Sequence, residues 1–494
     1  MSDSGRFTNP VIPGFHPDPS ICRAGADYYL ACSSFEYFPG VPIFHSRDLV
    51  HWDQIGNVLE SYALPDTTPS SGGVYAPTLR YHDDRFWLIT SDVSGGGTVL
   101  FTAADPAGPW SEPVRMPEVP GVDPDLAWDD EGRCWCTYAG IEQVRIDPET
   151  GRTLGEPRHL WSGTPGAQWP EAPHLYQIGD YWYLLIAEGG TERGHCVSVA
   201  RSLDPDGPFE PCPANPILTH RSTSRPIQST GHADLAQAPD GSWWMVLLGV
   251  RLRGGSPGWH VMGRETYLAP VTWPDGWPAV GEVAPAMAVP EWPTYPVAEP
   301  PVRFDFDEPR LHPQWISLRS RPASHWSLAD PAGWLALRAR GRSLDDPNAT
   351  FVGRRQQHLS CRVRALADTA AGRGGLAVRL DERHHYEVEV DDREARALAR
   401  IGPLRQTLGT LAVPPGPVVL RIEVHTTEPG TPAAGPDTVH LGVEDPGGRF
   451  AALAELDGRY LSTEVAGGFT GRVIGMYATA GTVRFDWFDY EALK

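Results

Sequence analysis

A short aromatic strand that follows a glycine or aspartate turn recurs five times along the first part of the chain. The five turns begin at Gly25, Asp83, Gly132, Gly179 and Gly241, so that successive copies start 58, 49, 47 and 62 residues apart. Further short strands with alternating polar and apolar residues follow each turn, and no long helical periodicity intervenes. Repeats of about 40–50 residues with several strands each are typical of propeller blades. The pattern predicts a five-bladed β-propeller over residues 1–282, and a pair of β-sandwiches with accidental spacing is the alternative.

Alternation with a period of two also runs through the last part of the chain. It covers residues 334–338, 376–380, 386–390, 418–424 and 483–490. These stretches predict a second domain, a β-sandwich over residues 302–494, and the fold class is therefore all-β. Residues 283–301 between the two domains are rich in proline, which predicts a semi-rigid connector. Glu387 and Glu389 share one face of a predicted strand, and we interpret that face as solvated.

Composition excludes several classes of partner. The formal net charge of −21 argues against nucleic acids and anionic membranes. No stretch approaches the roughly 18 apolar residues of a membrane span, and the first residues contain no secretory signal, so we expect a cytoplasmic location. The seven cysteines are scattered along the chain, as expected of reduced thiols. The many Trp and Tyr residues suit all-β structure and provide flat rings that can stack on sugars.

A polar or aromatic residue stands seven to nine positions ahead of each aromatic turn. These residues are Asp18, Tyr75, Asp123, Glu171 and His232. The strand before the turn is the innermost strand of a propeller blade, so the five positions should converge on one mouth of the central channel. Burying three like charges is costly unless chemistry or a cation requires it. The convergence therefore predicts a functional site on the propeller axis.

Paired carboxylates across a sugar-sized gap suit the hydrolysis of a glycosidic bond. Asp18 lies between two prolines, which restrict its backbone and hold the carboxylate in a fixed position. A rigidly held carboxylate suits the role of general base. Glu171 has apolar neighbours that would raise its pKa, as a general acid requires. Asp123 would orient Glu171 and tune its pKa, although Asp125 could also face inward and only the repeat offset favours Asp123. His232 could bind a sugar hydroxyl, hold a water molecule or ligate a metal ion.

Several longer motifs resemble glycoside hydrolase family 43, in its β-xylosidase/α-L-arabinofuranosidase branch. The motifs span residues 9–20, 34–40, 45–52, 71–77, 187–191 and 263–266, and the resemblance extends to the C-terminal concanavalin-like sandwich of that branch. It implies an inverting mechanism in which Asp18 is the general base, Asp123 modulates the pKa of the acid, and Glu171 is the general acid.

The same resemblance implies the residues that bind the terminal sugar. His232 and Arg264 correspond to the pocket histidine and arginine of the family. Phe35 would shape the sugar subsite, and Phe469 resembles a phenylalanine of the C-terminal sandwich that closes the pocket in related β-xylosidases. Two departures leave the choice between xylose and arabinofuranose open. Tyr75 stands where many β-xylosidases have Trp, and residues 64–69 lack the arginine that those enzymes carry before Ser71.

The sequence as a whole predicts an exo-acting, inverting glycoside hydrolase. It would release terminal β-D-xylose, α-L-arabinofuranose or both from xylo- and arabinoxylo-oligosaccharides. An endo-arabinanase, which needs an open groove, is one alternative. A carbohydrate-binding propeller without catalysis is the other, although it gives no reason for three converging carboxylates. No cofactor is expected to be required, and the sequence leaves open both a calcium ion near His232 and assembly into a homo-oligomer.

Overall fold

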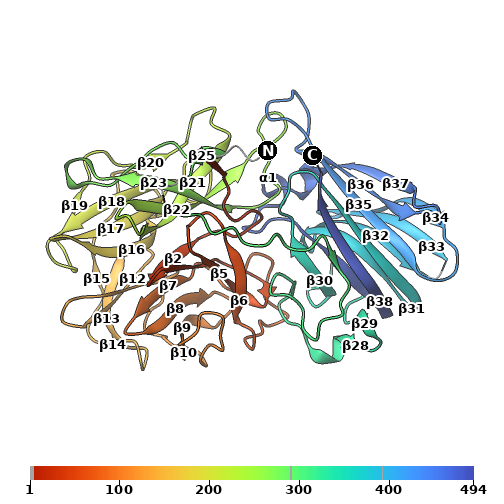
Figure 1. The fold of residues 1–494 in the computed structure, drawn as a ribbon, viewed down its shortest axis with the longest axis horizontal. Coiled ribbons are helices and arrows are strands. Elements are labelled where there is room, and N and C mark those ends of the chain that lie inside the picture. Colours follow the sequence, from red (N-terminus) through yellow and green to blue (C-terminus); the bar gives the residue numbers. More distant parts are fainter. Residues whose placement is uncertain (1–4, 290–291, 392, 494) are drawn as a thin grey trace.

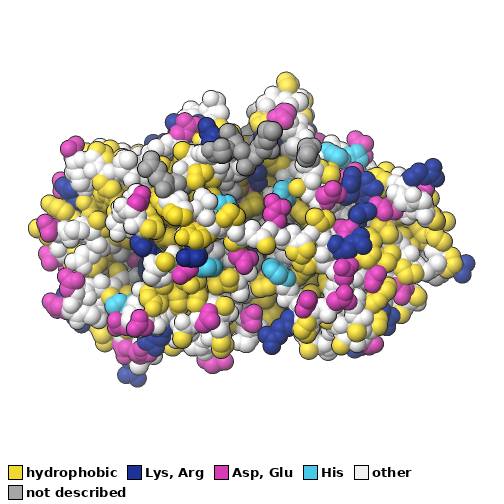
Figure 2. Space-filling model, viewed as in Figure 1, with side chains coloured by type: hydrophobic (Ala, Val, Ile, Leu, Met, Phe, Trp, Pro, Cys, Tyr) yellow, Lys and Arg dark blue, Asp and Glu magenta, His cyan; other side chains and the backbone are white. Residues whose placement is uncertain are grey.

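Two all-β halves lie side by side in the computed structural model, which describes residues 5–289, 292–391 and 393–493 (Figure 1). The propeller half lies on the left of the view and the C-terminal half on the right, with both chain ends near the top of the boundary. No helix within the described ranges is long and apolar enough to cross a membrane. Acidic side chains are spread over the visible face of both halves, in keeping with the net charge of −21 (Figure 2).

Five antiparallel sheets form the predicted five-bladed propeller, and each starts with its innermost strand. The first blade contains β2 (Ser20–Ala24), β3 (Asp27–Ala31), β5 (Gly40–Ser46) and β6 (Asp53–Leu59). The second contains β7 (Thr78–His82), β8 (Arg85–Asp92), β9 (Gly97–Ala103) and β10 (Val114–Arg115). The third contains β11 (Asp125–Trp128), β12 (Cys134–Tyr138), β13 (Glu142–Asp147), β14 (Arg152–Thr153) and β15 (Arg158–His159).

The last two blades follow the same plan. The fourth contains β16 (Glu171–Ile178), β17 (Tyr181–Glu188), β18 (Cys196–Ser202), β19 (Glu210–Pro211) and β20 (Leu218–Thr219). The fifth contains β21 (Ile227–Gln237), β22 (Trp243–Arg251), β23 (Glu265–Thr272) and β24 (Ala279–Val280). Each aromatic strand of the repeat is the second strand of its blade, and side chains such as Trp87, Trp135 and Trp182 are buried there.

The N-terminal segment closes the propeller onto its fifth blade. β1 (Arg6–Thr8) pairs with β25 (Ala286–Ala288). The Asn9 side-chain amide donates a 2.9 Å hydrogen bond to the Leu268 carbonyl of β23, and the Asn9 backbone N–H donates one to Pro285. The propeller therefore continues into the stretch predicted as connector, of which residues 290–291 lie outside the described residues. The domain boundaries proposed from the sequence stay predictions.

Two long bent strands organise the C-terminal sandwich. β31 (Cys361–Asp381) and β38 (Val473–Ala492) pair with each other along most of their length. Residues 373–381 of β31 pair with β32, whereas residues 361–367 pair with β35, so the strand runs through both layers. The buried residues between the layers include Val363, Val388 and Phe485.

The remaining strands extend the two layers outward from β31 and β38. One layer adds β32 (His384–Asp391), β33 (Glu394–Ile401), β34 (Leu404–Ala412), β30 (Thr350–Arg355) and β27 (Ile316–Leu318). The other adds β35 (Val418–Thr426), β36 (Asp437–Glu444), β37 (Phe450–Asp457), β26 (Arg303–Phe304), β29 (Ala332–Arg338) and β28 (Trp326–Ala329). A single helical turn, α1 (Thr463–Ala466), precedes β38.

The solvated face expected at Glu387 and Glu389 is buried instead, so that prediction was wrong. The two residues are only 1% and 6% exposed. The loop before β30 lies over this face, because the Asp345 carboxylate sits 3.0 Å from Nε2 of His385 on the same strand. Period-two alternation identifies two faces of a strand but does not show what covers each of them.

A strand of the propeller joins the sheet of the sandwich. β4 (Tyr37–Phe38) pairs with β27, with Tyr37 opposite Leu318 and Phe38 opposite Ser317. Phe15, Phe35 and Tyr37 share a buried apolar cluster with side chains of the sandwich that include Phe351 and Tyr477. The interface between the two domains is therefore a core of its own rather than a loose contact.

The Arg319 side chain, 1% exposed, connects several loops at this interface. Its Nε donates to the Thr68 carbonyl at 2.6 Å, Nη1 to the Pro347 carbonyl at 2.6 Å, and Nη2 to the Glu382 carboxylate at 2.5 Å. The Arg319 backbone N–H also donates to the Glu36 carbonyl at 2.7 Å. Because the side chain binds residues of both domains, its removal should lower the stability of both.

Replacing Arg319 with Met should therefore destabilise the whole protein. The variant keeps the stem of the side chain but leaves the two carbonyls without their donor and Glu382 without one of its ion-pair partners. Breaking a buried pair of this kind costs about 3–5 kcal/mol. Urea denaturation followed by tryptophan fluorescence measures the loss.

A matched control uses an arginine of the sandwich surface. Arg338 lies 3.8 Å from Asp330, and their side chains are 56% and 71% exposed. Arg338→Met should cost at most about 1 kcal/mol, because solvent screens exposed pairs. Equal losses in the two variants would contradict the special role of Arg319.

Candidate active site

The five positions that the repeat offset selects come together in space. Asp18, Tyr75 and Asp123 lie just ahead of the innermost strands β2, β7 and β11, whereas Glu171 begins β16 and His232 lies within β21. All five line one cavity of about 300 Å³. Phe35, Arg264 and Phe469 line the same cavity, so every predicted site residue borders it. The predicted catalytic and sugar-binding residues can therefore act on one substrate bound in this cavity.

Unusual backbone conformations mark the inner ends of these strands. Asp18, Asp123 and His232 have φ angles of 55°, 53° and 45°. Non-glycine residues rarely adopt this left-handed region, and each instance costs on the order of 1–3 kcal/mol. The pairing of β16 shifts register between Glu171 and His174, as it does in β21 around His232. Such bulges redirect side chains next to active sites.

Asp18 is a buried carboxylate with three polar neighbours. One oxygen accepts a 2.5 Å hydrogen bond from the Ser33 hydroxyl, and the other accepts a 2.9 Å bond from Nη1 of Arg264. Nδ1 of His232 lies 3.5 Å from the same oxygen as Arg264. Burial alone would raise the pKa of Asp18, but Arg264, His232 and Ser33 together hold it below its ordinary value. Asp18 is therefore ionised at neutral pH.

Glu171 and Asp123 show the opposite shift. Burial, followed by the charge of Asp18, raises the pKa of Glu171 to about 7, although Arg264 opposes the change. Burial and the charges of Glu171 and Asp18 also raise the pKa of Asp123. One Asp123 oxygen accepts a 3.2 Å hydrogen bond from the backbone N–H of Ala172, next to Glu171. The cavity therefore holds an ionised carboxylate and a carboxylic acid at the same pH.

His232 is a neutral imidazole in this setting. Burial lowers its pKa to about 4, although the nearby Asp18 charge raises it. Calcium prefers six to eight oxygen ligands, and a histidine beside one carboxylate does not fit that preference. No group of three or more His, Cys, Asp or Glu side chains in the described part of the chain could hold a metal ion. A calcium ion near His232 stays a prediction that these residues do not favour.

The second domain supplies one wall of the cavity through Phe469. The Phe469 ring stacks on Phe35 with 6.0 Å between ring centroids, and it meets Tyr75 edge to face at 5.9 Å. Its backbone N–H donates to the Ser71 hydroxyl at 2.8 Å, and its carbonyl accepts from Nη2 of Arg264 at 3.4 Å. The aromatic wall is thus shared by both domains.

Glycines let the Phe469 loop approach the propeller this closely. A Cβ atom at Gly468, where φ is +84°, would lie 2.5 Å from the Ser71 hydroxyl oxygen. A Cβ at Gly471 would lie 2.3 Å from the Met262 carbonyl oxygen. Larger residues at either position would push the loop, and Phe469 with it, away from the cavity.

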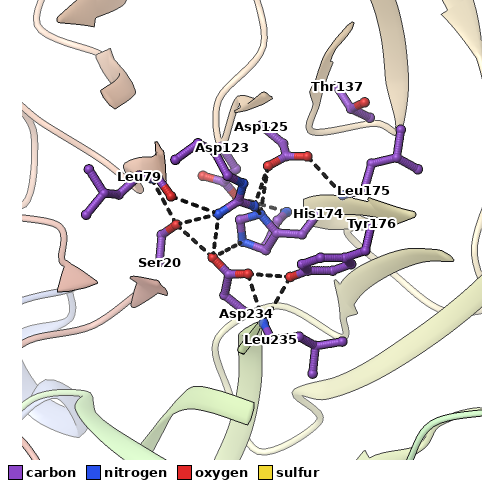
Figure 3. A network of polar contacts seen from close by, with 12 residues as sticks. Ser20, Leu79, Asp123, Asp125, Thr137, His174, Leu175, Tyr176, Asp234 and Leu235 are labelled. Atoms are coloured by element: carbon purple, nitrogen blue, oxygen red, sulfur yellow. Dashed lines mark hydrogen bonds and ion pairs between the residues drawn. The ribbon is translucent and has the colours of Figure 1, made fainter. Parts of the chain in front are cut away.

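A second layer of polar residues lies deeper on the propeller axis (Figure 3). Arg80 donates to Asp125 at 2.7 Å and to Asp234 at 2.8 Å. Asp125 also contacts His174, and Asp234 accepts from Ser20 and Tyr176. These residues come from the innermost strands of all five blades. Asp125 was the alternative to Asp123, and the structure places it in this layer rather than at the cavity.

Sequence reasoning overlooked several residues that border the cavity. Trp169, Thr191 and Glu192 line it, and Ser33 binds Asp18 behind it. Thr191 lies within the motif of residues 187–191, and Trp169 stands two positions before Glu171. Ser33 had no comparable signal, because its role depends on where the loop after β3 meets the loop that carries Asp18.

Comparison with known families supports the same interpretation of both domains. The family model described as "Glycosyl hydrolases family 43" matches residues 7–278. The chain belongs to glycosyl hydrolase family 43. A second model, described as "Beta xylosidase C-terminal Concanavalin A-like domain", matches residues 303–491. The predicted family, fold and enzyme class are thereby confirmed, and the protein is an inverting glycoside hydrolase.

Relatives in family 43 match the chain over nearly its full length. The non-reducing end α-L-arabinofuranosidase BoGH43B of Bacteroides ovatus is 39% identical over 99% of this chain and 95% of that relative. A xylosidase/arabinosidase of Butyrivibrio fibrisolvens is 35% identical over 98% of each chain. The crystal structure of a xylan β-1,4-xylosidase from Bacillus halodurans C-125 has a TM-score of 0.89 at 32% identity, and covers 98% of this chain and 100% of that chain.

The family 43 site allows a direct test of its electrostatics. Replacing Asp18 with Asn removes a negative charge from the cavity, so the pKa of Glu171 should fall from about 7 toward its ordinary value of 4.5. A pH titration of carboxyl-labelled glutamate by carbon-13 NMR follows the group, and Glu171→Gln assigns the signal.

The control removes a carboxylate elsewhere on the propeller. Asp129 lies in the hairpin between β11 and β12, where it binds Arg133 at 2.7 Å. Asp129→Asn should leave the Glu171 titration unchanged. A Glu171 pKa that stays near 7 in the Asp18 variant would show that burial alone sets it.

Proposed function

We propose that this family 43 enzyme releases one terminal pentose, β-D-xylose or α-L-arabinofuranose, from the non-reducing end of xylo- or arabinoxylo-oligosaccharides. The observation that carries the proposal is the pairing of ionised Asp18 with protonated Glu171 across a small cavity. Phe469 limits that cavity on one side, which suits a single sugar unit better than the open groove of an endo-arabinanase. A cytoplasmic location and assembly into a homo-oligomer remain predictions.

Asp18 acts as the general base in this mechanism. Its carboxylate takes a proton from a water molecule, whose oxygen attacks the anomeric carbon from the face opposite the leaving oxygen. Glu171 gives its proton to the glycosidic oxygen as the bond to the anomeric carbon breaks. The sugar is released with inverted configuration, and positive charge that builds on the ring is stabilised by the nearby carboxylates.

Asp123 supports Glu171 rather than reacting itself. Burial and the charges of Glu171 and Asp18 raise the pKa of Asp123. The hydrogen bond that Asp123 accepts from the Ala172 N–H holds the backbone beside the acid. Arg264 and His232 offer donors to the hydroxyl groups of the terminal sugar. Phe35, Tyr75 and Phe469 provide apolar walls that exclude water from the reacting centre.

The names of the relatives support a pentose as the terminal sugar. They include an α-L-arabinofuranosidase, a xylosidase/arabinosidase and a xylan β-1,4-xylosidase. The two sugars offer similar hydroxyl groups to a small cavity, so activity on both is compatible with the site. Tyr75, which stands where many β-xylosidases have Trp, lines the cavity that would hold the terminal sugar.

Hydrolysis of nitrophenyl β-D-xyloside and nitrophenyl α-L-arabinofuranoside tests the proposal. We expect turnover of at least one of them and, by proton NMR, a first-formed sugar of inverted anomeric configuration. Xylo-oligosaccharides should lose single sugars from one end. Retained configuration, or internal cleavage of arabinan without release of single pentoses, would overturn the proposal.

Removal of the acid should depend on the leaving group. Glu171→Ala should slow the hydrolysis of β-1,4-xylobiose by about 10²–10⁴-fold, since a sugar alkoxide needs a proton to depart. The loss should be much smaller on nitrophenyl glycosides, whose leaving group departs without one. Steady-state kinetics on both substrates measure the difference.

The base variant provides the contrast. Asp18→Ala should abolish turnover of both substrate types, because no other group among the described residues is placed to deprotonate the water. Equal losses on xylobiose and on the nitrophenyl substrate in Glu171→Ala would remove Glu171 as the acid.

A further inference from the structure

Trp169 is a large aromatic side chain left exposed at the cavity. It is 68% exposed, although it lines the same cavity as Glu171. A tryptophan that contributed to a core would be mostly buried, as Trp182 and Trp244 of the same propeller are. Exposure at the mouth of an active site suggests that a ligand covers the ring.

The backbone around Trp169 is held in an unusual conformation. Its φ angle is 54°, in the left-handed region that bulky residues rarely adopt. Hydrogen bonds fix the backbone on both sides of Trp169. The Gln168 carbonyl accepts from the Gly189 N–H at 2.7 Å, and the Pro170 carbonyl accepts from the Gly140 N–H at 3.0 Å. The ring is thus placed by a rigid frame, and strained residues of this kind cluster at ligand sites.

A glycine beneath the indole leaves room for this placement. A Cβ atom at Gly190 would lie 3.3 Å from Cδ1 of Trp169. Gly190 itself lines the cavity, with Gln168, Thr191 and Glu192 as polar neighbours. An aromatic face with polar groups beside it is the arrangement that recognises a sugar ring, because the ring stacks while its hydroxyl groups find partners.

The position of Glu171 indicates which sugar this is. Glu171 protonates the oxygen that leaves, so the sugar attached to that oxygen lies on the Glu171 side of the cleaved bond. Trp169 precedes Glu171 by two residues, ahead of the same inner strand. The leaving sugar therefore extends toward the Trp169 ring, whereas the terminal sugar sits deeper in the cavity, beside Asp18 and Arg264.

We propose that the Trp169 indole is the platform for the sugar on the leaving side of the cleaved bond, and that it selects substrates in which a pyranose such as β-linked xylose follows the terminal pentose. The inference rests on the proposed function and adds a second subsite to it. The enzyme then prefers oligosaccharides over glycosides with small leaving groups.

Trp169→Ala tests the platform with two substrates that carry the same terminal sugar. Loss of stacking should lower kcat/KM for β-1,4-xylobiose about tenfold. The value for β-D-xylosyl fluoride should change less than about twofold, because a fluoride leaving group is too small to contact the ring. Nitrophenyl substrates are avoided, since their own aromatic ring could stack on Trp169.

Two further variants separate stacking from folding. Trp169→Phe keeps an aromatic face and should recover most of the xylobiose activity. Leu203→Ala removes another exposed apolar side chain, 67% exposed in the turn after β18, and should match the parent on both substrates.

Binding measured without turnover gives an independent result. In an Asp18→Ala background, Trp169→Ala should raise the Kd of xylobiose about tenfold by calorimetry and leave that of free xylose unchanged. Equal effects on xylobiose and xylosyl fluoride, or no effect on either, would overturn the platform while the proposed function stands. A parent enzyme that hydrolyses neither xyloside would overturn the platform, and one that also leaves nitrophenyl α-L-arabinofuranoside intact would overturn the proposed function as well.

Discussion

Balancing like charges on the propeller axis is the constraint on which the site depends. Arg80 neutralises Asp125 and Asp234 in the deeper layer, and Arg264 pairs with Asp18 at the cavity. Burial would raise the pKa of Asp234, but Arg80, His174 and the hydrogen bond from Tyr176 together lower it. No comparable cation pairs with Glu171 among the described residues. The same buried channel therefore holds one carboxylate ionised and another protonated, which are the states that the general base and the general acid of glycoside hydrolysis need.

The active site is a property of two domains. The propeller brings together Asp18, Asp123 and Glu171, whereas the sandwich provides Phe469. Arg319 of the sandwich also binds the Thr68 carbonyl of the propeller. β4 extends a sheet of the sandwich with a strand from the propeller, so the two halves share hydrogen bonds as well as apolar contacts. A cavity that Phe469 closes on one side favours the removal of terminal sugars. The exposed Trp169 ring marks the side from which the rest of the substrate extends.

Much of this arrangement could be predicted from local patterns. The aromatic repeat gave the number of blades, and the constant offset ahead of each turn selected five residues that line one cavity. The same reasoning failed for Glu387 and Glu389, which a loop covers, and could not choose firmly between Asp123 and Asp125. It also missed Ser33 and the structural role of Arg80, because neither residue belongs to the repeat offset.

The sequence by itself determined the fold class, the blade repeat and the inner-strand positions from which the carboxylates converge, because each follows from spacing within one repeat. Only the tertiary structure decided the charge state of those carboxylates and the closure of the cavity. Arg264 binds Asp18 across 246 residues of chain, and Arg264 meets the Phe469 carbonyl across 205. Such contacts depend on how whole domains pack, and pKa values depend on the distances and burial that packing creates. A local pattern contains neither quantity.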